Sequence, residues 1–103
     1  MVRAMPLPDG DSKLAHRLVE EGALLLDVRT PAEYQEHHLP NSLLIPHDEI
    51  ARRIDEVLQA QAGDKRKPIV VFCRRGGRAQ TAKSVLLANG FTEITNLGSI
   101  DAW

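Results

Sequence analysis

Short apolar stretches alternate with helical patterns along the chain, and this alternation restricts the fold more than any other feature of the sequence. The apolar stretches are typical of buried strands, and they cover residues 23–28, 42–45, 68–72 and 93–97. The helical patterns predict a first helix capped by Asp11 or Ser12 and ended by Gly22, then helices over residues 31–36, 48–62 and 79–89. Thr30 and Glu33 are spaced as a capping box at the start of the second of these helices. Strands that alternate with helices usually pair in parallel, so the sequence predicts an α/β domain with helices on both faces of a parallel sheet.

The length of 103 residues indicates one domain, and we expect an N-terminal segment over residues 1–11 followed by a domain over residues 12–103. The formal net charge of −1 at pH 7 argues against broad binding of nucleic acid or of a membrane surface. Residues 1–10 contain two prolines and no apolar run of signal-peptide length. No stretch is long and apolar enough to span a membrane, so we expect a cytoplasmic protein.

The only cysteine, Cys73, follows the third apolar stretch and precedes the last helical pattern. The turn at this junction contains Gly76 and Gly77, which can adopt positive φ angles. Consecutive backbone N–H groups of such a turn can form an anion-binding nest, and the positive end of the helix dipole lies behind it. Three arginines within residues 74–78 add positive charge. Together these groups favour the thiolate, which is the nucleophilic form of cysteine.

A simpler interpretation treats Cys73 as a small core residue and the Arg74–Arg75 pair as solvated surface charge. That interpretation does not explain why a cysteine, two glycines and three arginines occur together where a strand gives way to a helix. A chain with one cysteine cannot form an internal disulfide, and an exposed thiol needs a compartment that keeps it reduced. We therefore favour a nucleophilic cysteine in a cradle for a small anion.

Other polar residues have less specific patterns. Asp27 and Arg29 follow a strand and could face the same edge of the sheet as Cys73, although a pair that braces neighbouring loops is the simpler interpretation. The four histidines are spaced in no pattern typical of a zinc site, and no second cysteine accompanies them. We expect no metal and no cofactor.

Four segments of the chain resemble the signatures of the single-domain rhodanese family. Members of this family are thiosulfate sulfurtransferases. These segments are residues 26–34, 38–46, 73–78 and 97–103. The resemblance extends from about residue 12 to residue 103 and implies a rhodanese-like parallel sheet of four to five strands. It also implies that His38 is a structural, hydrogen-bonding residue at a turn near the site.

The resemblance implies that Cys73 attacks the outer sulfur of thiosulfate, that sulfite leaves, and that Cys73 then carries a persulfide. Cyanide or a thiol, including a protein thiol, would then accept the sulfur. The substrate-binding residues implied in this way are Arg74, Arg75, Gly76, Gly77 and Arg78. Their backbone N–H groups would hold the substrate oxygens or the persulfide, Arg74 and Arg75 would face the entrance, and Arg78 would brace the loop from within.

Two other classes of protein remain open at this point. A persulfide carrier serving a protein partner would have the same cysteine loop, whereas non-catalytic binding modules that resemble this family commonly lack the cysteine, so its presence here counts against a binding module. A cysteine phosphatase or arsenate reductase would also place a Cys-to-Arg loop between a strand and a helix. However, such loops are one residue longer than the present one, in which residues 74–77 separate Cys73 from Arg78, and no separate aspartate stands out as a general acid.

Overall fold

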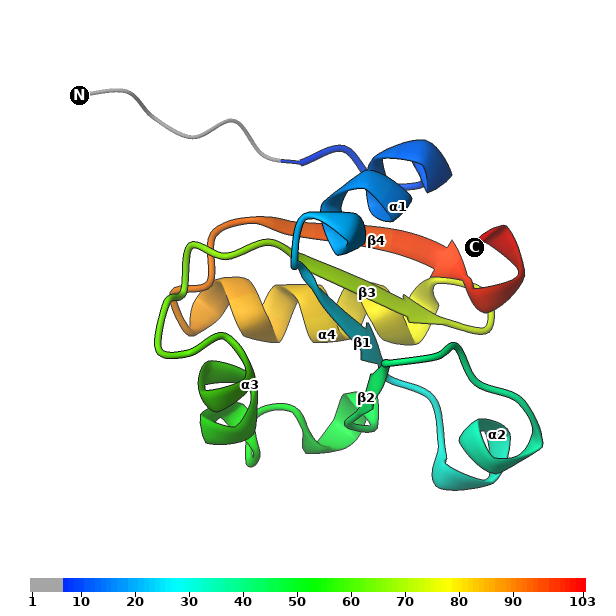
Figure 1. Ribbon diagram of the computed structural model, residues 1–103. Helices are drawn as coiled ribbons and strands as arrows, with labels where there is room; N and C mark the ends of the chain where they lie inside the picture. Colours follow the sequence, from blue (N-terminus) through cyan, green and yellow to red (C-terminus); the bar gives the residue numbers. More distant parts are fainter. Residues whose placement is uncertain (1–6) are drawn as a thin grey trace.

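The structure, a computed structural model, describes residues 7–103, so that residues 1–6 of the expected N-terminal segment lie outside the described residues. Figure 1 shows the arrangement of its helices and strands. In chain order, these elements are α1 (Ser12–Glu20), β1 (Leu24–Asp27), α2 (Pro31–Glu36), β2 (Leu43–Leu44), the 3-10 helix η1 (His47–Glu49), α3 (Ile54–Ala60), β3 (Ile69–Cys73), α4 (Gly77–Ala88), β4 (Ile94–Ser99) and the 3-10 helix η2 (Ile100–Ala102).

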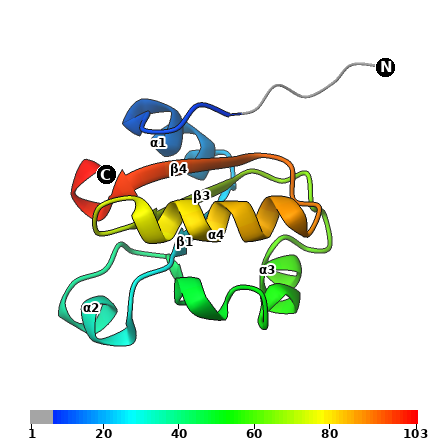
Figure 2. The same ribbon diagram turned by 180° about the vertical axis from the view of Figure 1, so that it is seen from behind.

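The four strands form one sheet in the order β2-β1-β3-β4, and all neighbouring strands are parallel. Helices α3 and α4 cover one face of the sheet and α1 covers the other, as the two opposite views show (Figures 1 and 2). The prediction of a parallel sheet of four to five strands with helices on both faces is therefore confirmed. The whole of β3 is buried because it lies inside the sheet and is covered on both faces.

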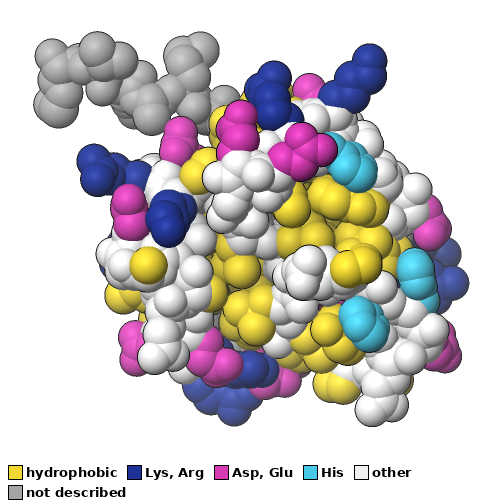
Figure 3. All heavy atoms as spheres, in the orientation of Figure 1, with side chains coloured by type: hydrophobic (Ala, Val, Ile, Leu, Met, Phe, Trp, Pro, Cys, Tyr) yellow, Lys and Arg dark blue, Asp and Glu magenta, His cyan; other side chains and the backbone are white. Residues whose placement is uncertain are grey.

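Two apolar clusters hold the layers together. The first joins α3 and α4 to the sheet through side chains such as Val57, Ala82 and Val71. The second joins α1 to the opposite face through side chains such as Leu14 and Phe72. Figure 3 shows apolar side chains gathered at the centre of the face that α1 covers, with charged side chains around its margin.

The helical pattern over residues 48–62 does not form the single long helix that the sequence predicts. The chain instead forms η1, then turns, and then α3 begins at Ile54. The break falls before Arg53, whose backbone angles (φ −110°, ψ 26°) are not helical. Its guanidinium binds both Glu49 and Glu56, but pairs at these spacings also form in a continuous helix and do not explain the break. Tertiary packing therefore overrides the apolar periodicity here.

Residues before α1 run along the outer edge of β4. The Gly10 N–H donates to the Asn96 carbonyl at 2.8 Å, and the Thr95 hydroxyl donates to the Pro8 carbonyl at 2.6 Å. These bonds partly cover an edge strand whose backbone groups would otherwise be open to pairing.

Within residues 7–103, no helix has the length and apolar character needed to cross a membrane.

Candidate active site

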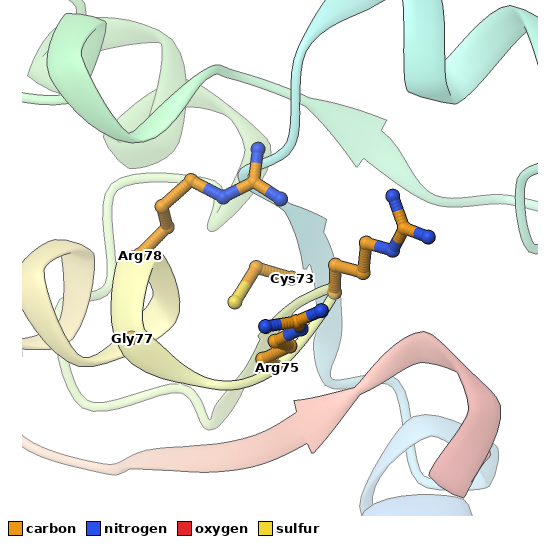
Figure 4. A pocket seen from close by; sticks show the side chains of 5 residues that line it. Cys73, Arg75, Gly77 and Arg78 are labelled. Carbon is orange, nitrogen blue, oxygen red and sulfur yellow. The ribbon is translucent and has the colours of Figure 1, made fainter.

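Cys73 is the last residue of β3 and lies at the floor of a cavity of about 300 Å³. The cavity is lined by Cys73, Arg74, Arg75, Gly77 and Arg78, and Figure 4 shows the sulfur pointing into the space between Arg75 and Arg78. The cysteine as a whole is only 1% exposed. The cysteine is therefore buried at the end of β3, and it meets solvent only at the cavity that it lines.

Two backbone N–H groups donate to the Cys73 sulfur. The Gly76 N–H lies 2.9 Å from Sγ and the Ala79 N–H lies 3.4 Å from it. Amide hydrogens aimed at sulfur stabilise negative charge on it. The sequence does not indicate the donor at Ala79, because Ala79 lies one residue beyond the expected loop and has no side-chain group that marks it.

Helix α4 begins at Gly77, two residues earlier than the sequence predicts, and Gly76 is its N-cap. Gly76 has the left-handed φ of 103° that the predicted turn requires, whereas Gly77 has no positive φ. Gly76 therefore uses the positive φ that a glycine permits, whereas Gly77 is already helical. The earlier start brings the positive end of the α4 dipole directly to the sulfur, where it favours an anion.

Arg78 forms a two-point ion pair with Glu33 of α2, with N–O distances of 2.5 and 3.0 Å. The guanidinium lowers the pKa of Glu33 to about 2, and the same hydrogen bonds raise the pKa of Arg78. The sequence predicted Glu33 only as a capping-box residue, a role it also fulfils through Thr30. Arg78 therefore ties the first turn of α4 to α2. The carboxylate that balances its charge lies outside the loop.

Arg74 and Arg75 are exposed, and within residues 7–103 neither forms an ion pair. Both line the cavity. Arg74 also borders an adjacent cavity of about 220 Å³ next to α2 and η2. The two unpaired guanidinium groups thus supply the net positive charge at the entrance, while the charge of Arg78 is balanced by Glu33.

Asp27 and Arg29 form a buried ion pair at the end of β1, with an N–O distance of 2.8 Å. Arg29 also donates to the carbonyl of His37 at 2.6 Å and to that of Glu33 at 3.4 Å. Arg29 therefore holds α2 at Glu33 and at its C-terminal end. The ion pair lies beside the site and contributes no group to the cavity that contains the Cys73 sulfur.

His38 lies in the turn after α2, where its ring stacks on Tyr34 with centroids 3.9 Å apart and its Nδ1 lies 2.8 Å from the Tyr34 carbonyl. It does not line the cavity at Cys73. Among the described residues, no group of three or more histidine, cysteine or acidic side chains is arranged to hold a metal ion.

Together, the fold and the site define a class: a parallel α/β domain with a cysteine at the carboxyl end of an inner strand and backbone amides around its sulfur. Residues 11–103 match the family described as the rhodanese-like domain. The chain is 34% identical over 90 residues to the thiosulfate sulfurtransferase GlpE of Pseudomonas syringae, covering 86% of this chain and 79% of that protein. It is 36% identical over 92 residues to a sulfurtransferase of Allochromatium vinosum, covering 87% and 80%.

Solved structures agree with this assignment. A rhodanese with anions from E. coli superposes with a TM-score of 0.70 at 29% identity, covering 80% of this chain and 92% of that one. The chain belongs to the rhodanese-like domain family, and the family and fold expected from the sequence are confirmed.

Proposed function

We propose that this protein is a sulfurtransferase that moves the outer sulfur of thiosulfate to a thiol or cyanide through a persulfide on Cys73. The observation that carries the proposal is the pair of N–H groups, from Gly76 and Ala79, that donate to the Cys73 sulfur at the floor of a cavity rich in arginine. Relatives that cover most of the chain are named as sulfurtransferases, which supports a rhodanese-type enzyme.

In the first step, the Cys73 thiolate attacks the outer sulfur of thiosulfate. A bond forms between the two sulfurs while the S–S bond of thiosulfate breaks, and sulfite leaves with the bonding electron pair. Sulfite is a stable anion, so no general acid has to protonate the leaving group. In the second step, a thiolate or cyanide attacks the outer sulfur of the persulfide, and the Cys73 thiolate is regenerated.

The residues of the loop have different roles in this reaction, which depend on whether their charge is neutralised by a neighbouring carboxylate. Gly76 and Ala79 stabilise negative charge on sulfur, because their N–H groups already point at it. Arg74 and Arg75 attract the dianionic donor, because no carboxylate within residues 7–103 neutralises them. Arg78 is paired with Glu33 and mainly holds the cavity wall in place, while Gly77 leaves the entrance open.

The alternatives are less well supported by the same geometry. A phosphatase needs a general acid for an alkoxide leaving group. Among residues 7–103, the only acidic side chain paired with the loop is Glu33, which has a pKa of about 2 and is ionised at neutral pH. A carrier that delivers its persulfide to a protein thiol shares the first step and differs only in its acceptor. Clean persulfide formation without turnover by small thiols would favour the carrier.

We also propose that the enzyme works in the cytoplasm. The chain has one cysteine, which must stay reduced to react, and the cytoplasm keeps thiols reduced.

The proposal is tested by incubating the protein with thiosulfate and cyanide and measuring thiocyanate. We expect turnover by the wild type and none by Cys73→Ser, whose hydroxyl is a far weaker nucleophile. Equal turnover by the two proteins would overturn the mechanism. An arylphosphatase activity lost in Cys73→Ser, with no thiocyanate formed by the wild type, would point to the phosphatase class instead.

A further inference from the structure

Asn96 of β4 has a buried side chain whose amide bonds to the residues around the active-site loop. Its Nδ2 donates to the Gly76 carbonyl at 3.1 Å and, more weakly, to Gln80 Oε1 at 3.4 Å. Its Oδ1 accepts from the Gly98 N–H at 2.8 Å. The residue is 8% exposed, so these bonds are shielded from water. The proposed reaction does not by itself require this residue.

A β-bulge aims Asn96 toward the loop. Val71 pairs with Asn96 and the next residue, Phe72, pairs with Gly98, so Leu97 is an extra residue in β4. Bulges bend a strand and redirect its side chains, and they occur often beside active sites. Asn96 Oδ1 binds the N–H of Gly98, the residue that follows the extra one, and its Nδ2 remains to hold Gly76.

The loop also touches β4 directly. A Cβ atom added to Gly76 would lie 3.3 Å from the Gly98 Cα, which is closer than nine in ten real contacts of a Cβ atom. On the other side of β4, the Asn96 N–H donates to Asp9 Oδ1 at 2.8 Å, and Asp9 is paired with Lys83 of α4 at 2.7 Å. The position of Asn96 is therefore fixed by its backbone as well as by its side chain.

We infer that Asn96 is a positioning residue for sulfur transfer: by holding the Gly76 carbonyl, it keeps the Gly76 N–H aimed at the Cys73 sulfur. One residue carries both groups, and only its φ and ψ torsions separate the held carbonyl from the donating N–H. Gly76 has no side chain to restrict these torsions, so hydrogen bonds to its carbonyl have to do so. The Gln80 N–H of α4 donates to this carbonyl at 2.9 Å, and Asn96 supplies the second donor from β4. The kinetic consequence rests on the proposed function, whereas the effect on sulfur reactivity does not.

Loss of this contact lowers the rate of the chemical step and leaves donor binding almost unchanged. The thiosulfate dianion is attracted by Arg74 and Arg75, which Asn96 does not contact. The N–H of Gly76 acts on charge at the reacting sulfur. Removal of one such donor in an oxyanion hole slows catalysis by about 100- to 1000-fold, so we expect about tenfold where the donor is loosened rather than removed.

The test compares wild type with Asn96→Asp, which still accepts from the Gly98 N–H but cannot donate to the Gly76 carbonyl. Asn96→Ser is a neutral second variant whose side chain is too short to reach that carbonyl, and it separates the lost bond from the added charge. Thr95→Val is the matched control, because Thr95 is the preceding buried residue of β4 and its hydroxyl binds Pro8, away from the loop. Persulfide formation is followed in single turnovers with thiosulfate, and Cys73 alkylation by iodoacetamide is followed without it.

We expect both Asn96 variants to form persulfide about tenfold more slowly, with KM for thiosulfate within about twofold of wild type and with slower alkylation at pH 7. Thr95→Val should lose thermal stability while keeping the wild-type rates. Wild-type rates in a folded Asn96 variant would overturn the inference, and so would a Thr95→Val variant that is slowed as much. If wild type forms no persulfide but alkylation still depends on Asn96, the proposed function fails and the positioning role stands.

Discussion

The carboxylate of Glu33 and the guanidinium of Arg78 meet in a two-point ion pair, although 45 positions separate the residues in the sequence. The pair joins the N-terminal turn of α2 to the first turn of α4, which carries the sulfur cradle. It also leaves Arg74 and Arg75 as the cations of the cavity that no described carboxylate neutralises. The contribution of this contact to stability can be measured by unfolding, separately from the sulfur-transfer reaction.

Replacement of Glu33 by glutamine should lower the free energy of unfolding at pH 7 by about 1 kcal/mol, the upper range for a partly exposed ion pair. Glutamine keeps an oxygen for the Thr30 N–H, so the capping box is largely preserved. Urea unfolding measures the change. Glu36→Gln, an exposed change in the same helix, should alter stability by less than about 0.5 kcal/mol.

The stabilisation by Glu33 should disappear in acid. The ordinary pKa of this carboxyl is 4.5 and the ion pair lowers it to about 2 in the folded protein, so the unfolded chain takes up the proton first as the pH falls. The difference in stability between wild type and Glu33→Gln is therefore full above about pH 5 and shrinks toward zero between pH 4.5 and pH 2. A difference that stays constant down to pH 2 would contradict the ion pair.

Replacement of the two loop glycines by alanine should have opposite effects on the free energy of unfolding. Gly76→Ala should lower the free energy of unfolding by at least about 1–2 kcal/mol, because its φ of 103° is unfavourable for any side chain. The new Cβ would also press on Gly98. Gly77→Ala meets no atom within 4 Å and lies in a helix, so stability should stay the same or rise by about 0.5–1 kcal/mol. Equal losses in the two variants would show that the loop has a different conformation.

Asp27→Asn should be the most destabilising of these changes. Asp27 is fully buried and Arg29 is 5% exposed, so a neutral partner leaves a buried, uncompensated guanidinium. Breaking such a pair costs about 3–5 kcal/mol, which urea unfolding can measure. Asp64→Asn breaks a contact whose arginine is exposed and should cost less than about 1 kcal/mol.

Arg75→Gln should weaken capture of thiosulfate more than the chemical step. Loss of an exposed, unpaired cation at the entrance should raise KM several-fold, leave kcat within about twofold, and reduce the dependence of kcat/KM on salt. Arg66→Gln removes an exposed cation from the loop before β3 and should change none of these parameters. A fall in kcat at unchanged KM would instead place Arg75 among the groups that act on the reacting atoms.

Patterns within short stretches of sequence predicted the helix caps and the buried strand correctly, because these features depend on neighbouring residues. The Thr30–Glu33 capping box and the Asp11 cap both form as the sequence indicates. The continuous apolar run before Cys73 forms a strand that is buried on both faces. Cys73 also lies at the carboxyl end of a strand, as the sequence indicates, because it is the last residue of β3.

Contacts between distant segments could not be predicted in this way. No periodicity links Glu33 to Arg78 or Asn96 to Gly76, because each contact depends on how separate elements pack. The helix expected over residues 48–62 is interrupted before α3, where Arg53 has a non-helical backbone, and an apolar pattern does not encode such a break. The bulge that aims Asn96 likewise depends on the pairing of β4 with β3.

The central claim, a persulfide on Cys73, is tested most directly by intact and peptide mass spectrometry after incubation with thiosulfate alone. We predict an increase of about 32 Da, one sulfur atom, on the peptide that contains Cys73, and its removal by cyanide or dithiothreitol. Oxidation to the sulfinic acid adds a similar mass but resists these reagents. No added mass on Cys73, or an increase that these reagents do not remove, would contradict the mechanism.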